Sequence, residues 1–222
     1  MIKAVIFDMD GVIIDSEPIY LDLAIQFLKK YLKQDYDQEK FDKTICTAVG
    51  KSDHKLFEIV SEFLSDEYTW EEVHEKSQKE WRTFTLNYKT ILKPHLINVL
   101  KDLKSQNLKL AIASSSPYDN IMQVVKECEI QDYFEYMTSG EDFKESKPNP
   151  EIYDHTIKKL GLKPDEVIAI EDSTYGIEAA LQSGCTCIAL EDTRFGFDQS
   201  KAHYLVKDLF QANKIINKVK SQ

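Results

Sequence analysis

The feature that most constrains the fold of this chain is a regular alternation of strand-like and helix-like segments that begins after Pro94. Strands that alternate with helices predict a parallel sheet with helices on both of its faces. Right-handed crossovers then bring the carboxyl ends of the strands to one edge of the sheet, where ligands of such folds bind. The predicted helices are residues 97–105, 118–127, 151–160, 174–183 and 205–220, and the predicted strands are residues 109–113, 135–138, 167–170, 186–190 and 203–206.

One more strand and a long helical segment precede this alternation. Residues 3–8 form a nearly continuous apolar run, typical of a strand that is buried on both faces of a parallel sheet. The sequence DSEP at residues 15–18 then carries the signals of a helix start, namely capping residues, an acid in the first turn and a proline where no N–H is needed. Apolar side chains follow helical spacing from there to about residue 88. We therefore predict an α/β core of residues 1–16 and 89–222 with an all-helical insertion of residues 17–88.

The charge of the chain limits its partners. Its 38 acidic residues exceed its 28 basic residues, for a formal net charge of −10. Nucleic acids and anionic membrane surfaces both select clustered Lys and Arg, so we expect neither as a partner. No apolar run approaches the roughly 18 residues that cross a bilayer, and acids near the N-terminus argue against a secretory signal. We expect a cytoplasmic monomer that needs a local cation if its ligand is an anion.

The cysteines do not indicate a metal site. Cys185 and Cys187 are too close in sequence for the usual zinc pair, and the chain has no His-x-x-x-His partner for them. They alternate with Thr186 beside apolar residues, which favours buried thiols in a strand.

Two carboxylates follow the first predicted strand directly. Asp8 and Asp10 lie in the sequence DMDG at residues 8–11. If they are crowded together, they would share a proton or bind a divalent cation. The alternative is a solvated turn, which the same residue types also favour.

Three serines follow the predicted strand 109–113. Ser116 can cap the next helix, with Pro117 at its first position. Ser114 and the N–H of Ser115 then lie at a helix N-terminus, which is a natural phosphate site. The alternative is a plain helix cap with no ligand.

A lysine and two further acids lie near other strand ends. Pro148 favours an extended conformation for Lys147 and so constrains it more than an ordinary surface lysine, which is the alternative. Glu171 and Asp172 follow the strand 167–170, and Gly176 allows a close approach of backbones there. Taken together, carboxylates that bind a cation and Ser and Lys that bind an anion predict one pocket for metal-assisted phosphoryl chemistry.

The residues that carry these signals also resemble a known family. FDMDGVIIDS, the strand end at Ser114, SKPNPEIY and IEDSTYGIEAA look like the four motifs of the haloacid dehalogenase superfamily, subfamily I, and most resemble its β-phosphoglucomutase and phosphatase branch. The resemblance implies a parallel-sheet core of the haloacid dehalogenase type. It also implies that residues 17–88 are a helical cap domain, which the family carries between its first and second motifs.

The resemblance further implies a role for each motif residue. Asp8 would be the nucleophile that forms an aspartyl-phosphate, and Asp10 the general acid and base. Ser114, Ser115 and Lys147 would bind the phosphoryl oxygens. The implied cofactor is Mg²⁺, held by Asp8, the carbonyl of Asp10 and Asp172, with Glu171 nearby.

The helical insertion departs from the mutase pattern. The family's mutases carry a histidine soon after the first motif and a Gly-x-Ser-Arg loop, where this chain has Tyr20 and Gly50-Lys51-Ser52-Asp53. Lys76 matches a cap lysine that meets the sugar phosphate, although a solvated helix face is the alternative for it.

These departures favour a phosphatase of small phosphorylated metabolites, most of all sugar phosphates. The first alternative is a β-phosphoglucomutase, which transfers the phosphoryl group between sugar hydroxyls. A phospho-receiver domain and a catalytically silent regulatory protein are more distant alternatives, because the former has no helical insertion and the latter has no need of both Asp8 and Asp10.

Overall fold

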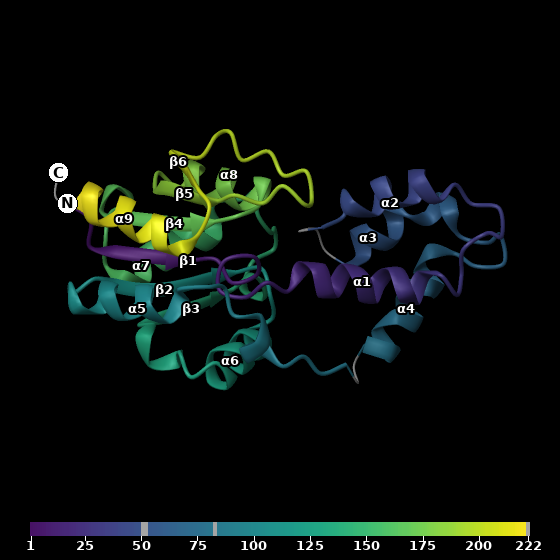
Figure 1. The fold of residues 1–222 in the computed structure, drawn as a ribbon, viewed down its shortest axis with the longest axis horizontal. Coiled ribbons are helices and arrows are strands. Elements are labelled where there is room, and N and C mark those ends of the chain that lie inside the picture. The colour runs from purple at the N-terminus through teal and green to yellow at the C-terminus, as the bar shows by residue number, and fades with distance from the viewer. Residues whose placement is uncertain (50–52, 82–83, 221–222) are drawn as a thin grey trace. The chain divides into compact units, whose positions relative to one another are not determined.

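The computed structural model describes residues 1–49, 53–81 and 84–220. The chain divides into two compact units, each of which we describe by itself (Figure 1). The α/β unit contains Met1–Asp15, Asn87–Thr193 and Phe197–Gln222, and the helical unit contains Ser16–Leu86 and Arg194–Gly196.

The α/β unit is built on one parallel sheet of six strands in the order β3-β2-β1-β4-β5-β6. The chain order reverses at β1, which pairs with β2 on one side and with β4 on the other, so β1 lies at the topological switch point where ligands of such sheets bind. The strands are β1 (Ala4–Phe7), β2 (Lys109–Ser114), β3 (Tyr136–Ser139), β4 (Val167–Glu171), β5 (Thr186–Leu190) and β6 (Tyr204–Val206). The predicted fold class is confirmed.

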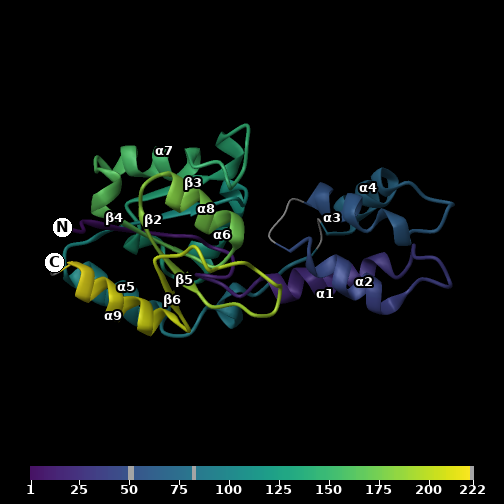
Figure 2. The ribbon, with the colours of Figure 1, turned by 90° about the horizontal axis from the view of Figure 1, so that it is seen from above.

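Helices cover both faces of this sheet. The helices α5 (Leu96–Ser105) and α9 (Leu209–Lys220) lie together on one face, and α7 (Glu151–Leu160) and α8 (Thr174–Gln182) lie on the other (Figure 2). The remaining long helix is α6 (Tyr118–Glu127), and the short 3-10 helices of this unit are Tyr88–Ile91, Gln131–Tyr133, Gly140–Asp142 and Pro164–Glu166.

The alternation of side chains along the strands determines what faces α7 and α8. Ala4 and Ile6 of β1 and Val167 and Ala169 of β4 belong to the buried cluster that packs against these two helices. Because strand side chains alternate between faces, the next residues with the same orientation are Asp8 after β1 and Glu171 at the end of β4. The same alternation that builds the core therefore points two carboxylates towards α7.

The predicted core elements are present, and their ends shift by a few residues. The largest shift is in α9, which begins at Leu209 although the predicted helix begins at residue 205. Residues 204–206 instead pair with β5. Asp208 then accepts a hydrogen bond from the N–H of Gln211 (2.8 Å), as an N-cap does, and so marks the helix start.

The helical unit has its own apolar core. It contains α1 (Glu17–Leu28), α2 (Gln38–Cys46), α3 (Asp53–Ile59), a 3-10 helix (Ser61–Phe63) and α4 (Trp70–Trp81). Its buried residues include Phe27, Phe41 and Phe57, whose rings make edge contacts with neighbouring aromatic rings. The predicted helix start is confirmed, since α1 begins at Glu17 with a proline in its first turn. Ser16 is the N-cap residue, but its side chain makes no capping hydrogen bond, because Ser16 has helical backbone angles rather than the extended ones of a side-chain cap.

The cysteines are as expected, since Cys185 and Cys187 are buried at β5 and all four cysteines are free thiols. Across residues 1–49, 53–81 and 84–220, no helix combines the length and the apolar character needed to cross a membrane.

Candidate active site

The candidate site lies where the loops after β1, β2, β3 and β4 meet at the carboxyl edge of the sheet. Asp8 follows β1, and its N–H donates to the carbonyl of Ile170 (3.0 Å), so the strand pairing continues to the first carboxylate. Ser114 ends β2 and Glu171 ends β4. Lys147 reaches the same place from the long connection between β3 and α7.

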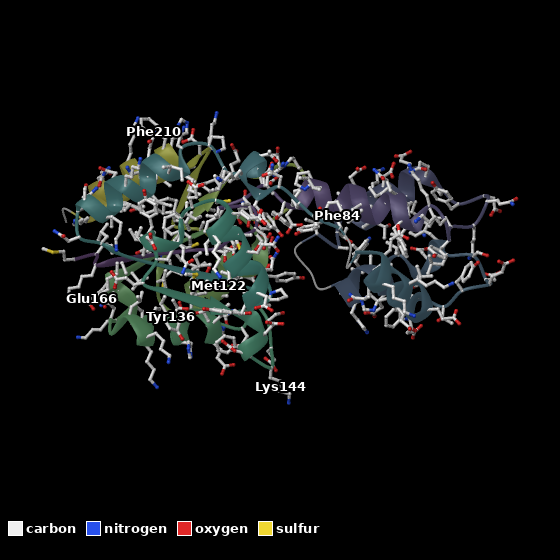
Figure 3. The ribbon with its side chains drawn as sticks, turned by 90° about the horizontal axis from the view of Figure 1, so that it is seen from below. Phe84, Met122, Tyr136, Lys144, Glu166 and Phe210 are labelled. Carbon is white, nitrogen blue, oxygen red and sulfur yellow. The ribbon has the colours of Figure 1, made fainter. Side chains whose placement is uncertain are left out.

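Lys147 is the cation at the centre of the site. Its ammonium donates to Asp8 Oδ1 (2.7 Å), to Glu171 Oε1 (2.7 Å) and to the carbonyl of Ala113 (3.0 Å). Only 7% of its side-chain surface is exposed, whereas Lys144 extends away from the ribbon into solvent (Figure 3). The three N–H donors of the ammonium thus have three protein acceptors, two of them charged.

Tyr153 supports this ion network from α7, and sequence reasoning missed it. Its buried hydroxyl donates to Glu171 Oε1 (2.5 Å), and its ring lies 5.2 Å from the Lys147 nitrogen, in cation–π range. A signal was available, because Tyr153 lies on the apolar stripe of an amphipathic helix and a buried phenol needs a hydrogen-bond partner. The sequence does not indicate which partner that is.

Burial and charge shift the pKa values of these groups. Burial raises the pKa of Asp8 to about 8; Glu171 acts in the same direction, and Lys147 acts against it. Burial would lower the pKa of Lys147, but the carboxylates of Asp8 and Glu171 outweigh burial and raise it, so Lys147 stays a cation. Burial and the same two carboxylates raise the pKa of Tyr153 well above its usual value, which keeps its hydroxyl a donor.

Asp8, Glu171 and Asp172 form a buried group of carboxylates. One oxygen atom of each lies within 4.8 Å of the others, and all three residues are buried. Two of these carboxyl groups, those of Asp8 and Glu171, share the ammonium of Lys147. Buried carboxylates this close together repel one another, and a cation placed among them relieves that repulsion. Hard oxygen ligands of this kind fit a divalent cation such as Mg²⁺. The side chain of Asp10 is not part of this group.

Two glycines make room for these carboxylates. Gly11 has a φ of +81°, and a Cβ atom at this position would overlap the carboxylate of Asp172. A Cβ atom at Gly176 would overlap the carboxylate of Glu171 in the same way. The close approach at Gly176 is therefore between a helix backbone and a carboxylate.

The hydrogen bonds of the serines at the end of β2 differ from those expected from the sequence. Ser116 does not cap α6, because its hydroxyl donates to Asp10 Oδ2 (2.8 Å). Pro117 takes the N-cap position, and Glu141 Oε2 accepts the N–H of Tyr118 (3.0 Å) in the first turn. The hydroxyl of Ser114 is buried and accepts the N–H of Ser116 (3.1 Å), while Ser115 is exposed.

Gln199 is a second residue that sequence reasoning missed. Its buried amide nitrogen donates to the carbonyls of Asp172 and Leu190 (2.7 Å to the latter), and its oxygen accepts the N–H of Asp192 (3.0 Å). It thereby joins the chain after β4 to the chain after β5. It comes from the irregular segment between β5 and β6, where neither periodicity nor a motif marks it.

The candidate residues of the helical unit are described separately. Tyr20 lies on α1 with 37% of its surface exposed. Lys76 lies on α4 with its ammonium 4.5 Å from the centre of the Tyr68 ring and 5.2 Å from that of Tyr31, so it packs on its own unit's aromatic side chains. Lys51 and Ser52 lie outside the described residues.

Comparisons with known proteins agree with this geometry. The sequence model of the haloacid dehalogenase-like hydrolase family matches residues 5–190. The chain is 30% identical over 184 residues to the phosphorylated carbohydrates phosphatase of Thermotoga maritima (82% of each chain). It is 29% identical over 189 residues to the phosphoglycolate phosphatase of Aquifex aeolicus (85% and 84%). Among solved structures, it resembles β-phosphoglucomutase of Clostridium difficile with a TM-score of 0.72, at 26% identity and full coverage of both chains.

Proposed function

This chain belongs to the haloacid dehalogenase-like hydrolase family, and from that premise we propose that it is a Mg²⁺-dependent phosphatase that hydrolyses small phosphomonoesters through an aspartyl-phosphate on Asp8. The names of its relatives indicate an enzyme of the phosphatase class, and sugar phosphates are the substrate class we propose. The observation that carries the proposal is the buried ion pair of Lys147 with Asp8 (2.7 Å), beside the carboxylates of Glu171 and Asp172.

The first half of the reaction transfers the phosphoryl group to the protein. An oxygen of the Asp8 carboxylate attacks phosphorus, and an O–P bond forms as the bond from phosphorus to the ester oxygen breaks. The ester oxygen leaves with the electron pair and takes a proton from the carboxylic acid of Asp10, so the alcohol departs neutral.

The second half returns the phosphoryl group to water. Asp10, now a carboxylate, takes one proton from a water molecule whose oxygen attacks phosphorus. The bond between phosphorus and the Asp8 oxygen breaks, and its electron pair returns to Asp8. One ester and one water have then become one alcohol and one phosphate, and both aspartates are as they began.

The other residues of the site bind charge. Ser114, the N–H of Ser115 and Lys147 hold the phosphoryl oxygens, as hydrogen-bond donors and a cation do for developing negative charge. Because Lys147 already has three acceptors, a phosphoryl oxygen must replace or share one of them. Asp8, Asp172 and the carbonyl of Asp10 would hold Mg²⁺, with Glu171 close by, and the cation would supply positive charge to the transferring group.

A mutase is the second candidate. The similarity to a β-phosphoglucomutase over the full length of both chains favours it, and its chemistry differs only in that a sugar hydroxyl takes the place of water. Tyr20 and residues 50–53 depart from the mutase pattern in sequence, which favours hydrolysis. A receiver domain carries no helical insertion, and a silent regulator would not need both Asp8 and Asp10.

A panel of phosphomonoesters with Mg²⁺ tests the proposal. We expect phosphate release that EDTA abolishes and that Asp8→Asn lowers about 10⁴-fold or more, as loss of a nucleophile does. Asp132→Asn makes the same chemical change at an exposed position and should leave the rate unchanged. Hydrolysis by Asp8→Asn at the parent rate would contradict the mechanism. Conversion of β-glucose 1-phosphate to glucose 6-phosphate with a bisphosphate primer, faster than phosphate release, would establish the mutase.

A further inference from the structure

We propose that Ser116 is a positioning residue for Asp10, and that Ser139 at the end of the neighbouring strand in turn positions Ser116. The inference rests on the proposed function, because it concerns the proton that Asp10 moves. It assigns a role to Ser116 and Ser139, which are not among the serines expected to bind phosphate, Ser114 and Ser115.

The contact between Ser116 and Asp10 joins residues that are 106 positions apart in the chain. The Ser116 hydroxyl donates to Asp10 Oδ2 at 2.8 Å, and the bond is partly buried. Asp10 itself lies in the turn after β1 and is half-buried, so the backbone alone does not define the direction of its carboxyl group. A donor on the neighbouring loop selects one direction and holds one of the two oxygens.

Ser116 is in turn held by hydrogen bonds on both sides of its peptide. Its N–H donates to the hydroxyl of Ser114 (3.1 Å), and its carbonyl accepts the hydroxyl of Ser139 (2.7 Å). Ser139 is 1% exposed and pairs directly with Ser114 in the parallel register of β2 and β3. The position of the Ser116 hydroxyl therefore follows from the pairing of these two strand ends.

Gly140 and Glu141, which follow Ser139, hold the loops after β2 and β3 close together. A Cβ atom at Gly140 would lie 2.9 Å from the Cα of Ser115, so only glycine fits without a shift of backbone. Glu141 then accepts the N–H of Tyr118 (3.0 Å), on the far side of Ser116. The loops after β2 and β3 are thus joined before and after Ser116, which leaves its hydroxyl little freedom to move away from Asp10.

This arrangement has a consequence that depends on the leaving group. A strongly basic alkoxide must take a proton from Asp10 as it departs, whereas the weakly basic p-nitrophenolate departs without one. Loss of the Ser116 hydroxyl lets the Asp10 carboxyl group turn away, so the first half of the reaction should slow for an alkyl ester and not for p-nitrophenyl phosphate. A residue that bound the phosphoryl group itself would affect both esters equally, because that group is the same in both.

Rapid-quench measurement of the first turnover with benzyl phosphate and p-nitrophenyl phosphate tests the proposal. The two esters carry one aromatic ring each and differ in the basicity of the leaving oxygen. In Ser116→Ala we expect the burst of benzyl alcohol to slow by about 10- to 100-fold, and the burst of p-nitrophenol by less than about threefold. Ser116→Thr keeps the hydroxyl and should restore the benzyl phosphate burst. Ser105→Ala removes an exposed hydroxyl on α5 and is the matched control.

The role of Ser139 is tested by a double-mutant cycle. Ser139→Ala should show the same selectivity for benzyl phosphate with a smaller loss, and it should add nothing in the Ser116→Ala background, because it acts through Ser116. Circular dichroism and thermal unfolding verify that each variant folds. If Ser116→Ala does not fold, Ser116→Cys, whose thiol is a weak donor, serves with the same expected selectivity.

The outcomes separate this inference from the proposed function. Equal losses for both esters in Ser116→Ala, or no loss for either, overturn the inference alone, provided that the parent hydrolyses both esters in the first turnover and Asp8→Asn does not. Losses in Ser139→Ala that multiply with those of Ser116→Ala overturn the part that concerns Ser139. A parent protein that hydrolyses neither ester in the presence of Mg²⁺ overturns both the inference and the proposed function.

Discussion

Lys147 is the residue on which the charge balance of the site depends. It is buried between the carboxylates of Asp8 and Glu171, and it also donates to the carbonyl of Ala113. Its removal would leave two buried carboxylates without their counter-charge, and the penalty for an unpaired buried charge exceeds the net value of the pair that is lost.

We therefore expect Lys147→Met to lower the free energy of unfolding of the α/β unit by about 3–5 kcal/mol and to abolish phosphatase activity. Lys144→Met makes the same chemical change at an exposed position three residues earlier and should stay within about 0.5 kcal/mol of the parent. Urea denaturation followed by circular dichroism measures both. Equal stabilities for the two variants would mean that the buried ion network contributes nothing to folding.

For a single residue, the sequence indicates the kind of local structure or environment more readily than the hydrogen-bond partner. Ser116 has the composition of a helix cap, and only the position of Asp10 decides that its hydroxyl points elsewhere. Tyr153 is recognisable as a buried phenol on an amphipathic helix, but its bond to Glu171 depends on how α7 crosses the sheet. Hydrogen bonds form within a few tenths of an ångström, a precision that local patterns do not carry.

Among the elements, α8 shows how the site constrains a helix. Gly176 lies in its first turns, where glycine is less favourable than alanine by about 1 kcal/mol. The helix accepts this penalty because the carboxylate of Glu171 occupies the space that a Cβ atom would take. Helix propensity thus favours alanine at position 176, whereas the geometry of the site requires glycine, and glycine is the residue present.

The sign of the effect of Gly176→Ala tests this explanation. Helix propensity alone would stabilise the variant, whereas displacement of Glu171 should destabilise it by about 1–3 kcal/mol and lower activity. Gly161→Ala adds the same methyl group where nothing lies within 4 Å, and it should lose only the roughly 1–2 kcal/mol of a left-handed backbone without loss of activity. A Gly176→Ala protein more stable than the parent would show that the Glu171 carboxylate yields easily.

The elements themselves were largely predictable, and their ends were less so. Helix α7 has the predicted bounds, because proline precedes it and Gly161 ends it in a left-handed conformation. Helix α9 begins later than its apolar periodicity indicates, because β6 takes residues 204–206 and Asp208 caps the helix. Strand pairing is a contact with another segment and therefore overrides a local pattern that fits both structures.

For the whole molecule, a net charge of −10 is compatible with an anionic ligand because charge acts locally. Surface acids are screened over about 8–10 Å at physiological ionic strength. The buried carboxylates of Asp8, Glu171 and Asp172 are not screened in this way. Burial, with a further contribution from Glu171, raises the pKa of Asp8 to about 8. A divalent cation would relieve the repulsion among these carboxylates and so stabilise the folded protein.

We therefore expect Mg²⁺ to raise the Tm of the α/β unit, by about 5–10 °C at 100 times its Kd, and more at pH 8 than at pH 6. In the metal-free protein a proton competes with Lys147 for the Asp8 carboxylate, because burial raises the pKa of folded Asp8 to about 8 whereas the unfolded chain loses this proton near pH 4. The contribution of Asp8 to stability therefore falls as pH rises between these values. Mg²⁺ must displace that proton, which becomes easier as pH rises towards 8. Differential scanning calorimetry at both pH values, with potassium chloride at equal ionic strength as the reference, measures the shift.

Two variants show whether the shift arises at this site. Asp8→Asn should remove the difference between pH 6 and pH 8, because it removes the group that titrates, and Asp132→Asn should keep it. The same rise in Tm in the Asp8→Asn protein would place the stabilising Mg²⁺ elsewhere on the molecule.

Local patterns in the sequence are enough to predict a parallel α/β sheet with Asp8, Ser114, Lys147 and Asp172 near one edge of it. Period-two and helical patterns are local properties, and the handedness of crossovers then leaves few arrangements of the strands. Which donor bonds to which acceptor depends instead on how the folded chain packs. Lys147 meets Asp8 across 139 residues of chain, and Ser116 meets Asp10 across 106. Such pairings depend on where separate loops come to lie when the sheet and its helices pack. No local pattern in the chain encodes the distance between side chains on different loops.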